Sequence, residues 1–283
     1  MKNLKQKHAN TGRNIIILLS FLLCLFPHRD AYGAETAKLV TEDAPTVERG
    51  DTEFELSYSY ATAARAYRSN NHTTDRGANH THTANAKVSH GLTSTLDMSI
   101  AWEWVKISDH DESPSSGTSL GDVTINTKYN FFANAVHYLS FVPAVLIPTG
   151  GVSNERELGP GQDYWSLDPM LAYTYVNDAF TGGSDIGYSI PLGHEREDQR
   201  GIFFTDLAAG YQVSDLFQPI AELNFAQEYV VGQPNPYTFG ITAGVILNVN
   251  ESLRIDLGVS QTLFGRLSDN TTAFLLNLSW TYS

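Results

Sequence analysis

Segments of roughly ten residues in which apolar and polar side chains alternate constrain the fold of this chain more than any other feature. The clearest are EFELSYSY (53–60), LDMSIAWEWV (96–105), DVTINTKYNF (122–131) and AFLLNLSWTYS (273–283). Successive side chains of a strand point to opposite faces, so each segment forms a strand with one apolar and one polar face. A helical period of 3.6 would scatter the same apolar residues around a cylinder, so the pattern favours strands.

Weaker segments of the same kind bring the predicted number of strands to about 12. They lie near residues 82–90, 138–147, 166–175, 184–192, 202–212, 219–228, 237–247 and 253–261. The links between strands alternate between short ones and longer ones rich in Gly, Pro, Asn, Asp, Ser and Thr. This spacing predicts antiparallel up-and-down hairpins with all long loops at one end, and we expect a single all-β domain over residues 53–283.

Two arrangements of such strands fit the alternation. A soluble barrel or sandwich turns its apolar face inward, whereas a transmembrane β-barrel turns that face to lipid and its polar face to a wet lumen. The segments have the length of a tilted membrane strand, about ten residues, where soluble strands have about 5–6. The polarised loop lengths are also typical of outer-membrane barrels. Both features favour the transmembrane barrel.

Aromatic residues on the apolar faces lie near the segment ends. Their rings suit the boundary between hydrocarbon and water, where one edge is apolar and the other carries a hydroxyl or an N–H group. The predicted aromatic girdle comprises Tyr58, Tyr60, Trp102, Trp104, Tyr173, Tyr175, Trp280 and Tyr282.

Charged residues on the polar faces predict the wall of the lumen, because a charge is costly against lipid and tolerated in a hydrated interior. The expected lumen-facing residues are Glu53, Glu55, Lys87, Asp97, Glu103, Lys128, Asp168, Asp206, Glu222, Arg254 and Asp256. Acidic groups outnumber basic ones in this set, so a charged permeant would be a cation.

The first 33 residues have the layout of a secretory signal peptide. Basic residues within 1–13 precede an apolar run at 15–26, and Ala31 and Gly33 mark a cleavage site before Ala34. The only cysteine, Cys24, lies in this stretch, which fits export through an oxidising periplasm. We expect residues 34–52 to form a short periplasmic segment ahead of the barrel.

The charge balance argues against nucleic acid as a partner. Five of the 18 basic residues and one of the 31 acidic residues lie in 1–33, which leaves a formal charge of −17 for the rest of the chain. The expected partners are outer-membrane lipid and lipopolysaccharide, a small-molecule permeant, and the barrel-assembly machinery. The machinery would recognise the closing strand, which ends one residue after the aromatic Tyr282.

Four stretches follow one another along the chain: HGLTSTLDMSIAWEW (90–104), SLGDVTINTKYNF (119–131), PAVLIPTG (143–150) and ELGPGQDYWSLDPMLAYTY (157–175). In this order they resemble the outer-membrane barrel family labelled "Putative MetA-pathway of phenol degradation". The resemblance implies a bacterial outer-membrane barrel that passes small, often aromatic or apolar, compounds. It implies no particular substrate and no binding residues.

Two stretches could hold a chemical site, but ordinary polar loops explain both of them better. The stretch 69–83 holds His72, His80 and His82, which we interpret as part of a polar external loop. Asp109, Asp111 and Glu112 are weak candidates for a divalent cation, because their loop lacks the glycine and terminal glutamate of an EF-hand. We expect no cofactor.

The sequence predicts a barrel for passive passage of small solutes, in the bacterial outer membrane. Two alternatives stay open. One is a non-conducting barrel that acts as an anchor or adhesin through its external loops. The other is an outer-membrane lipid hydrolase, which needs a base beside a nucleophile. His90, His137 and His194 lie at strand ends with no serine suitably placed, so an enzyme is not expected.

Overall fold

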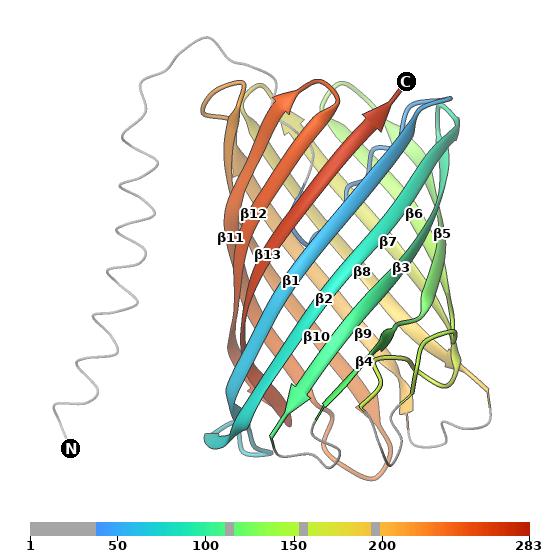
Figure 1. Ribbon diagram of the computed structural model, residues 1–283. Helices are drawn as coiled ribbons and strands as arrows, with labels where there is room; N and C mark the ends of the chain where they lie inside the picture. The colour runs from blue at the N-terminus through green and yellow to red at the C-terminus, as the bar shows by residue number, and fades with distance from the viewer. Residues whose placement is uncertain (1–37, 111–115, 153–157, 194–198) are drawn as a thin grey trace, which may run out of the picture. The chain divides into compact units, whose positions relative to one another are not determined.

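A computed structural model describes residues 38–110, 116–152, 158–193 and 199–283, and within them the chain forms one antiparallel sheet that closes on itself (Figure 1). The strands are β1 (Thr52–Tyr67), β2 (Thr73–Thr93), β3 (Leu96–Asp109), β4 (Ser116–Leu120), β5 (Val123–Ala133), β6 (His137–Ile147), β7 (Trp165–Asn177), β8 (Phe180–Leu192), β9 (Gln199–Tyr211), β10 (Phe217–Val230), β11 (Tyr237–Asn250), β12 (Leu253–Arg266) and β13 (Ser268–Tyr282). No helix in the described part of the chain is long and apolar enough to cross a membrane.

The wall is a closed barrel of twelve strands, as predicted, because β4 and β5 together occupy one strand position. β3 pairs with β5 over residues 96–101 and with β4 over residues 104–108. The break falls at Gly121 and Asp122. The first and last strands, β1 and β13, pair along almost their whole length from Thr52↔Tyr282 onward, and this pairing closes the barrel.

The strands extend further than their apolar alternation. Residues 68–72 alone link β1 to β2, and β12 turns into β13 at Leu267 alone, so strand residues fill most of the gaps between the predicted strands at 53–60 and 82–90 and at 253–261 and 273–283. Residues 73–81, predicted as part of an external loop, belong to β2. The backbone ladder continues through polar residues because its hydrogen bonds do not depend on the side chains. The expectation of a long loop between the predicted strands at 253–261 and 273–283 was therefore wrong.

The apolar faces point outward, as the transmembrane interpretation requires. Leu56, Leu207 and Phe274 on the outer wall are 57 %, 54 % and 54 % exposed, whereas Glu222 and Thr242 on the inner wall are 1 % and 0 % exposed. All eight girdle residues lie on this outer face, and rings pack across strands, as Phe54 does on Trp280 with 5.8 Å between centroids. The molecule thus has its apolar surface on the outside and its buried polar groups within.

Candidate functional site in the barrel lumen

The segment that precedes β1 lies inside the barrel. Its residues 38–47 hydrogen-bond to the inner faces of strands from β10 round to β3. The sequence predicted a short periplasmic segment over residues 34–52. Residues 38–47 instead lie within the lumen. Residues 1–37, which include the predicted signal peptide, lie outside the described residues.

We call residues 38–47 the inner segment. Glu222 on β10 makes more hydrogen bonds to this segment than any other wall residue with a described contact. Its Oε1 accepts a hydrogen bond from the Leu39 amide at 2.5 Å. Its Oε2 accepts three more, from the Val40 amide (3.0 Å), the Thr41 amide (2.8 Å) and the Thr41 hydroxyl (2.9 Å). A buried carboxylate is stable only when its oxygens are satisfied, and the inner segment satisfies both oxygens of Glu222.

Further contacts continue around the wall. The Glu42 amide donates to Asp185 on β8 at 2.8 Å, the Ala44 amide donates to Thr174 on β7 at 3.0 Å, and the Val47 amide donates to Asp97 on β3 at 2.9 Å. The Ala44 carbonyl in turn accepts from the side chains of Ser140 and Asn130. The inner segment thus follows the inner face of the wall from β10 past β8 and β7 to β3.

Two apolar side chains of the inner segment pack into apolar patches of an otherwise polar wall. Leu39 packs against Ile220 and Ile246, and Ala44 packs against Val142 and Ala172. Removing such side chains from water adds a favourable free energy of about 25 cal/mol per Å². The segment is therefore held by apolar packing as well as by hydrogen bonds.

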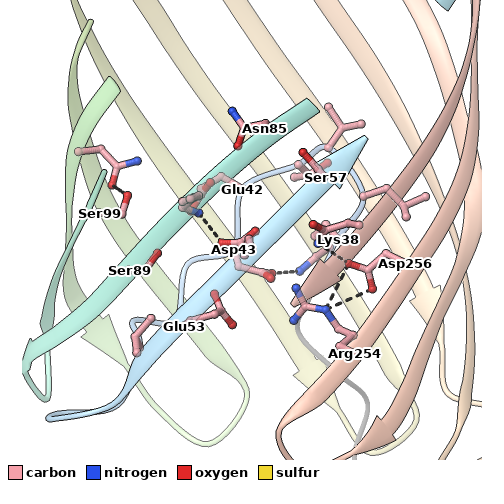
Figure 2. A pocket seen from close by; sticks show the side chains of 18 of the residues that line it. Lys38, Glu42, Asp43, Glu53, Ser57, Asn85, Ser89, Ser99, Arg254 and Asp256 are labelled. Atoms are coloured by element: carbon pink, nitrogen blue, oxygen red, sulfur yellow. Dashed lines mark hydrogen bonds and ion pairs between the residues drawn. The ribbon is translucent and has the colours of Figure 1, made fainter. Parts of the chain in front are cut away.

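A cavity of about 490 Å³ remains beside the inner segment, on the side of the barrel formed by β12, β13, β1, β2, β3 and β5 (Figure 2). Its charged lining residues are Lys38, Glu42, Asp43, Glu53, Glu55, Lys87, Asp97, Lys128, Arg254 and Asp256. Six of these are acidic and four are basic, so the cavity carries a formal excess of negative charge.

Ion pairs neutralise most of these charges. They are Lys38–Asp43 (2.5 Å), Lys87–Glu55 (2.9 Å), Lys128–Glu42 (2.6 Å) and Arg254–Asp256 (3.2 Å). Asp97 accepts the Val47 amide. Glu53 is in none of these pairs and faces the cavity, where Figure 2 shows it.

Glu42 belongs to the inner segment and not to a membrane-spanning strand. Burial raises the pKa of its carboxyl group, but the positive charges of Lys128 and Lys87 outweigh burial and lower that pKa to about 2. Glu42 therefore remains ionised and paired with Lys128 across the neutral and mildly acidic range.

The predicted lumen residues all lie on inner faces of the wall. Seven of them line the cavity: Glu53, Glu55, Lys87, Asp97, Lys128, Arg254 and Asp256. Glu222 instead holds the inner segment, Asp206 accepts a hydrogen bond from Asn224 at 2.8 Å, and Asp168 accepts one from Ser166 at 3.1 Å. Glu103 lies at the break between β4 and β5, next to Gly121.

Sequence reasoning missed the polar residues that bind the inner segment, namely Asn130, Ser140, Thr174 and Asp185. All four share the inward parity of their strands, so alternation could have placed them on the lumen wall. Nothing in the sequence indicated that residues 38–47 would be their partner.

The weak cation candidates do not form a site in the described residues. The Asp109 carboxylate pairs with Arg76 at 2.5 Å, and Arg76 also pairs with Asp269 at 2.5 Å. Asp111 and Glu112 lie outside the described residues. No cluster of three or more possible metal ligands occurs in the part of the chain that the structure describes.

The histidines considered for catalysis contact other residue types. His90 Nδ1 lies 3.0 Å from the Thr52 hydroxyl, and His137 Nδ1 lies 2.8 Å from the Tyr173 hydroxyl. Neither is hydrogen-bonded to a serine in the described structure, and His194 lies outside it. These contacts offer no base beside a serine nucleophile.

An all-β closed barrel with an apolar outer wall, an aromatic girdle and a charged lumen defines the class of outer-membrane β-barrels. Residues 77–266 match the family described as "Putative MetA-pathway of phenol degradation", and the chain belongs to this family, as its motifs predicted. Among curated proteins, none matches the chain.

Solved structures of outer-membrane barrels share the fold. The COG4313 outer membrane channel from Pseudomonas putida F1 superposes with a TM-score of 0.75 at 14% sequence identity, over 87% of this chain and 100% of that one. The NanC porin has a TM-score of 0.51 at 9% identity, over 80% of this chain and 98% of that one. The KdgM porin has a TM-score of 0.50 at 10% identity, over 81% and 99%. At these identities the comparisons establish the fold.

Proposed function

We propose that this protein is a channel of the bacterial outer membrane that lets small solutes cross passively. The observation that carries the proposal is the charged cavity beside the inner segment, because a barrel that served only as an anchor would not need unpaired charge in its interior. The inner segment leaves a cavity on one side of the lumen, and in this proposal that cavity is part of the solute path. The segment narrows the barrel well below the full width of twelve strands.

The permeant is small, and a charged permeant is a cation. Glu53, which makes no ion pair with the described residues, faces a cavity whose lining has two more acidic than basic groups. For an uncharged permeant, the description of the family favours aromatic or apolar compounds. The solved structure from Pseudomonas putida, which shares the fold, is described as an outer membrane channel.

Planar bilayers test the proposal. The purified protein should give discrete conductance steps that favour K⁺ over Cl⁻, and Glu53→Gln should shift the reversal potential toward zero. Glu251→Gln, in the exposed turn between β11 and β12, is the matched control and should leave the potential unchanged. A silent bilayer with correctly folded protein would contradict a channel.

A silent bilayer would favour the second candidate, a non-conducting barrel that presents its external loops. One observation supports it: the inner segment is hydrogen-bonded to strands over much of the circumference and packs against apolar patches as well. The bilayer recording decides between the two candidates, and so does the effect of deleting the segment.

A further inference from the structure

The outer face of β1, β2 and β3 is ordered in rows by the register of the strands. From the end with short turns, the rows are Phe54–Val88–Ile100, Leu56–Ala86–Trp102, Tyr58–Ala84–Trp104, Tyr60–His82–Lys106 and Thr62–His80–Ser108. The first three rows are apolar apart from the Tyr58 hydroxyl. The last two carry a cation, two imidazoles and three hydroxyls. The change from apolar to polar therefore falls between neighbouring rows of one surface.

The middle of the apolar rows holds two small side chains, and we infer a shallow groove there from the size of their neighbours. Ala84 and Ala86 lie between larger side chains on both sides, and those side chains stand well exposed: Leu56 at 57 %, Tyr58 at 42 %, Trp102 at 41 % and Trp104 at 39 %. Two small residues flanked by four large ones leave a channel along β2 that fits an extended hydrocarbon chain.

The polar rows above the groove hold donors. Lys106 is exposed on the outer face, directly opposite His82, and makes no ion pair with the described residues. The Tyr58 hydroxyl lies 2.8 Å from His82 Nδ1, and the Tyr60 hydroxyl lies 2.9 Å from His80 Nδ1. When these hydroxyls donate, each neutral imidazole carries its proton on Nε2 and has a second N–H donor for a ligand.

We propose that this face binds a phosphorylated glycolipid of the outer leaflet, lipopolysaccharide, with a lipid A phosphate at Lys106 and His82 and an acyl chain over Ala84 and Ala86. Charge complementarity selects this occupant. The chain has a formal charge of −13, so a lysine beside two imidazoles at the lipid boundary is a local exception that an anionic headgroup would match. The rows lie toward the end with long loops, which faces outward in outer-membrane barrels.

Native mass spectrometry of the folded protein with added bis-phosphorylated lipid A tests the site. We expect a one-to-one adduct that lipid A without phosphates forms more weakly. Lys106→Ala should lower the affinity about fivefold, which is the effect of one lysine at a charged lipid surface. Ala84→Phe should fill the groove and weaken binding of both lipids.

His137→Ala is the matched control. His137 also lies on the outer face and also hydrogen-bonds a tyrosine, Tyr173, but at the opposite end of the barrel. This variant should bind lipid A as the wild type does. Heat-modifiable migration on gels verifies that every variant is folded, so a loss of binding is not a loss of fold.

Equal affinity of Lys106→Ala and wild type, or equal binding of lipid A with and without phosphates, would overturn the proposal. The inference rests on the proposed outer-membrane location and not on conduction. Bilayer conductance of Lys106→Ala should equal that of the wild type, so failure of the lipid site and failure of the channel are separate results.

Discussion

Glu222 shows how one buried carboxylate organises the lumen. It is 1 % exposed, and its two oxygens accept four hydrogen bonds from Leu39, Val40 and Thr41. Hydrogen bonds to a charged acceptor contribute about 1.5–3 kcal/mol each, so this residue dominates the attachment of the inner segment. Ser140, Thr174 and Asp185 hold the rest of the segment through fewer bonds.

Glu222→Ala should release the inner segment, because three amides and a hydroxyl lose their acceptor. Since the only natural cysteine, Cys24, precedes residue 34, Val40→Cys provides a single label site in the chain from that residue on. Maleimide labelling at position 40 should accelerate at least tenfold in the Glu222→Ala background. Glu251→Ala, on an exposed turn, should leave the labelling rate as it is. An unchanged rate with Glu222→Ala would show that the carboxylate does not hold the segment.

Glu42 predicts how attachment of the inner segment depends on pH. The pKa of its carboxyl is about 2 when the segment is in place, below the ordinary value of 4.5, so the pair with Lys128 stabilises attachment above about pH 4.5. This stabilisation is lost progressively as the pH falls from 4.5 toward 2. A fluorophore on Val40→Cys should report constant attachment from pH 8 to pH 5 and release below.

Glu42→Gln supplies the control for that titration. It removes the ionisable group, so attachment should be weaker at pH 7 and the change between pH 4.5 and pH 3 smaller. Glu48→Gln, at an exposed position nearer β1, should titrate as the wild type does. Identical curves for Glu42→Gln and wild type would contradict a role for this pair.

At the scale of elements, three of the stretches that resemble the family, 119–131, 143–150 and 157–175, contact one another at the break between β4 and β5. We call this place the joint. The break between β4 and β5 contains Gly121 and Asp122, and the link between β6 and β7 folds against it. The Asp122 carboxylate accepts the Gly150 amide at 2.8 Å and the Gln162 amide at 2.7 Å. The Gly151 amide donates to the Leu120 carbonyl, so this link replaces a neighbouring strand along β4.

Gly150→Ala should disrupt this joint. A β-carbon there would lie 2.7 Å from the carbonyl carbon of Gly121, which is backbone and cannot rotate away. We expect the midpoint of urea unfolding to fall by an amount equivalent to about 1–3 kcal/mol, the usual cost of overpacking. Gly182→Ala is the control, since its β-carbon would lie 3.4 Å from the nearest atom, on the Phe180 ring. Equal midpoints for both variants would contradict tight packing at Gly150.

At the scale of the whole molecule, the barrel wall and the inner segment are held by different interactions. The wall closes through strand pairing alone, from β13 to β1 and onward to β3. The inner segment binds to side chains of the wall and takes no part in the backbone pairing between strands. We therefore expect the barrel to form without the segment and the segment to set how much of the lumen stays open.

Deletion of residues 38–47 should raise single-channel conductance several-fold, because the segment that lies within the lumen is gone. Conductance in planar bilayers measures this, and heat-modifiable migration confirms that the shortened protein is folded. Replacing the same residues by a Gly-Ser stretch of equal length separates loss of attachment from loss of chain. Unchanged conductance after deletion would mean that the constriction lies elsewhere in the lumen.

The sequence by itself determined the class of fold and the number of strand positions. Each follows from a period of two that is written into local segments such as 53–60 and 96–105. The length of the strands was underestimated, because β2 and β13 continue through polar residues that the backbone ladder pairs regardless of side chain.

Only the tertiary structure decided the path of residues 38–47 and the shape of the remaining lumen. Leu39 and Glu222 are 183 residues apart, and Thr41 lies beside the same carboxylate only because the closed wall brings β10 next to the inner segment. A segment without periodicity carries no local signal of its partners. Its position is set by unsatisfied polar groups and apolar patches that exist only once the barrel has brought them to one inner surface.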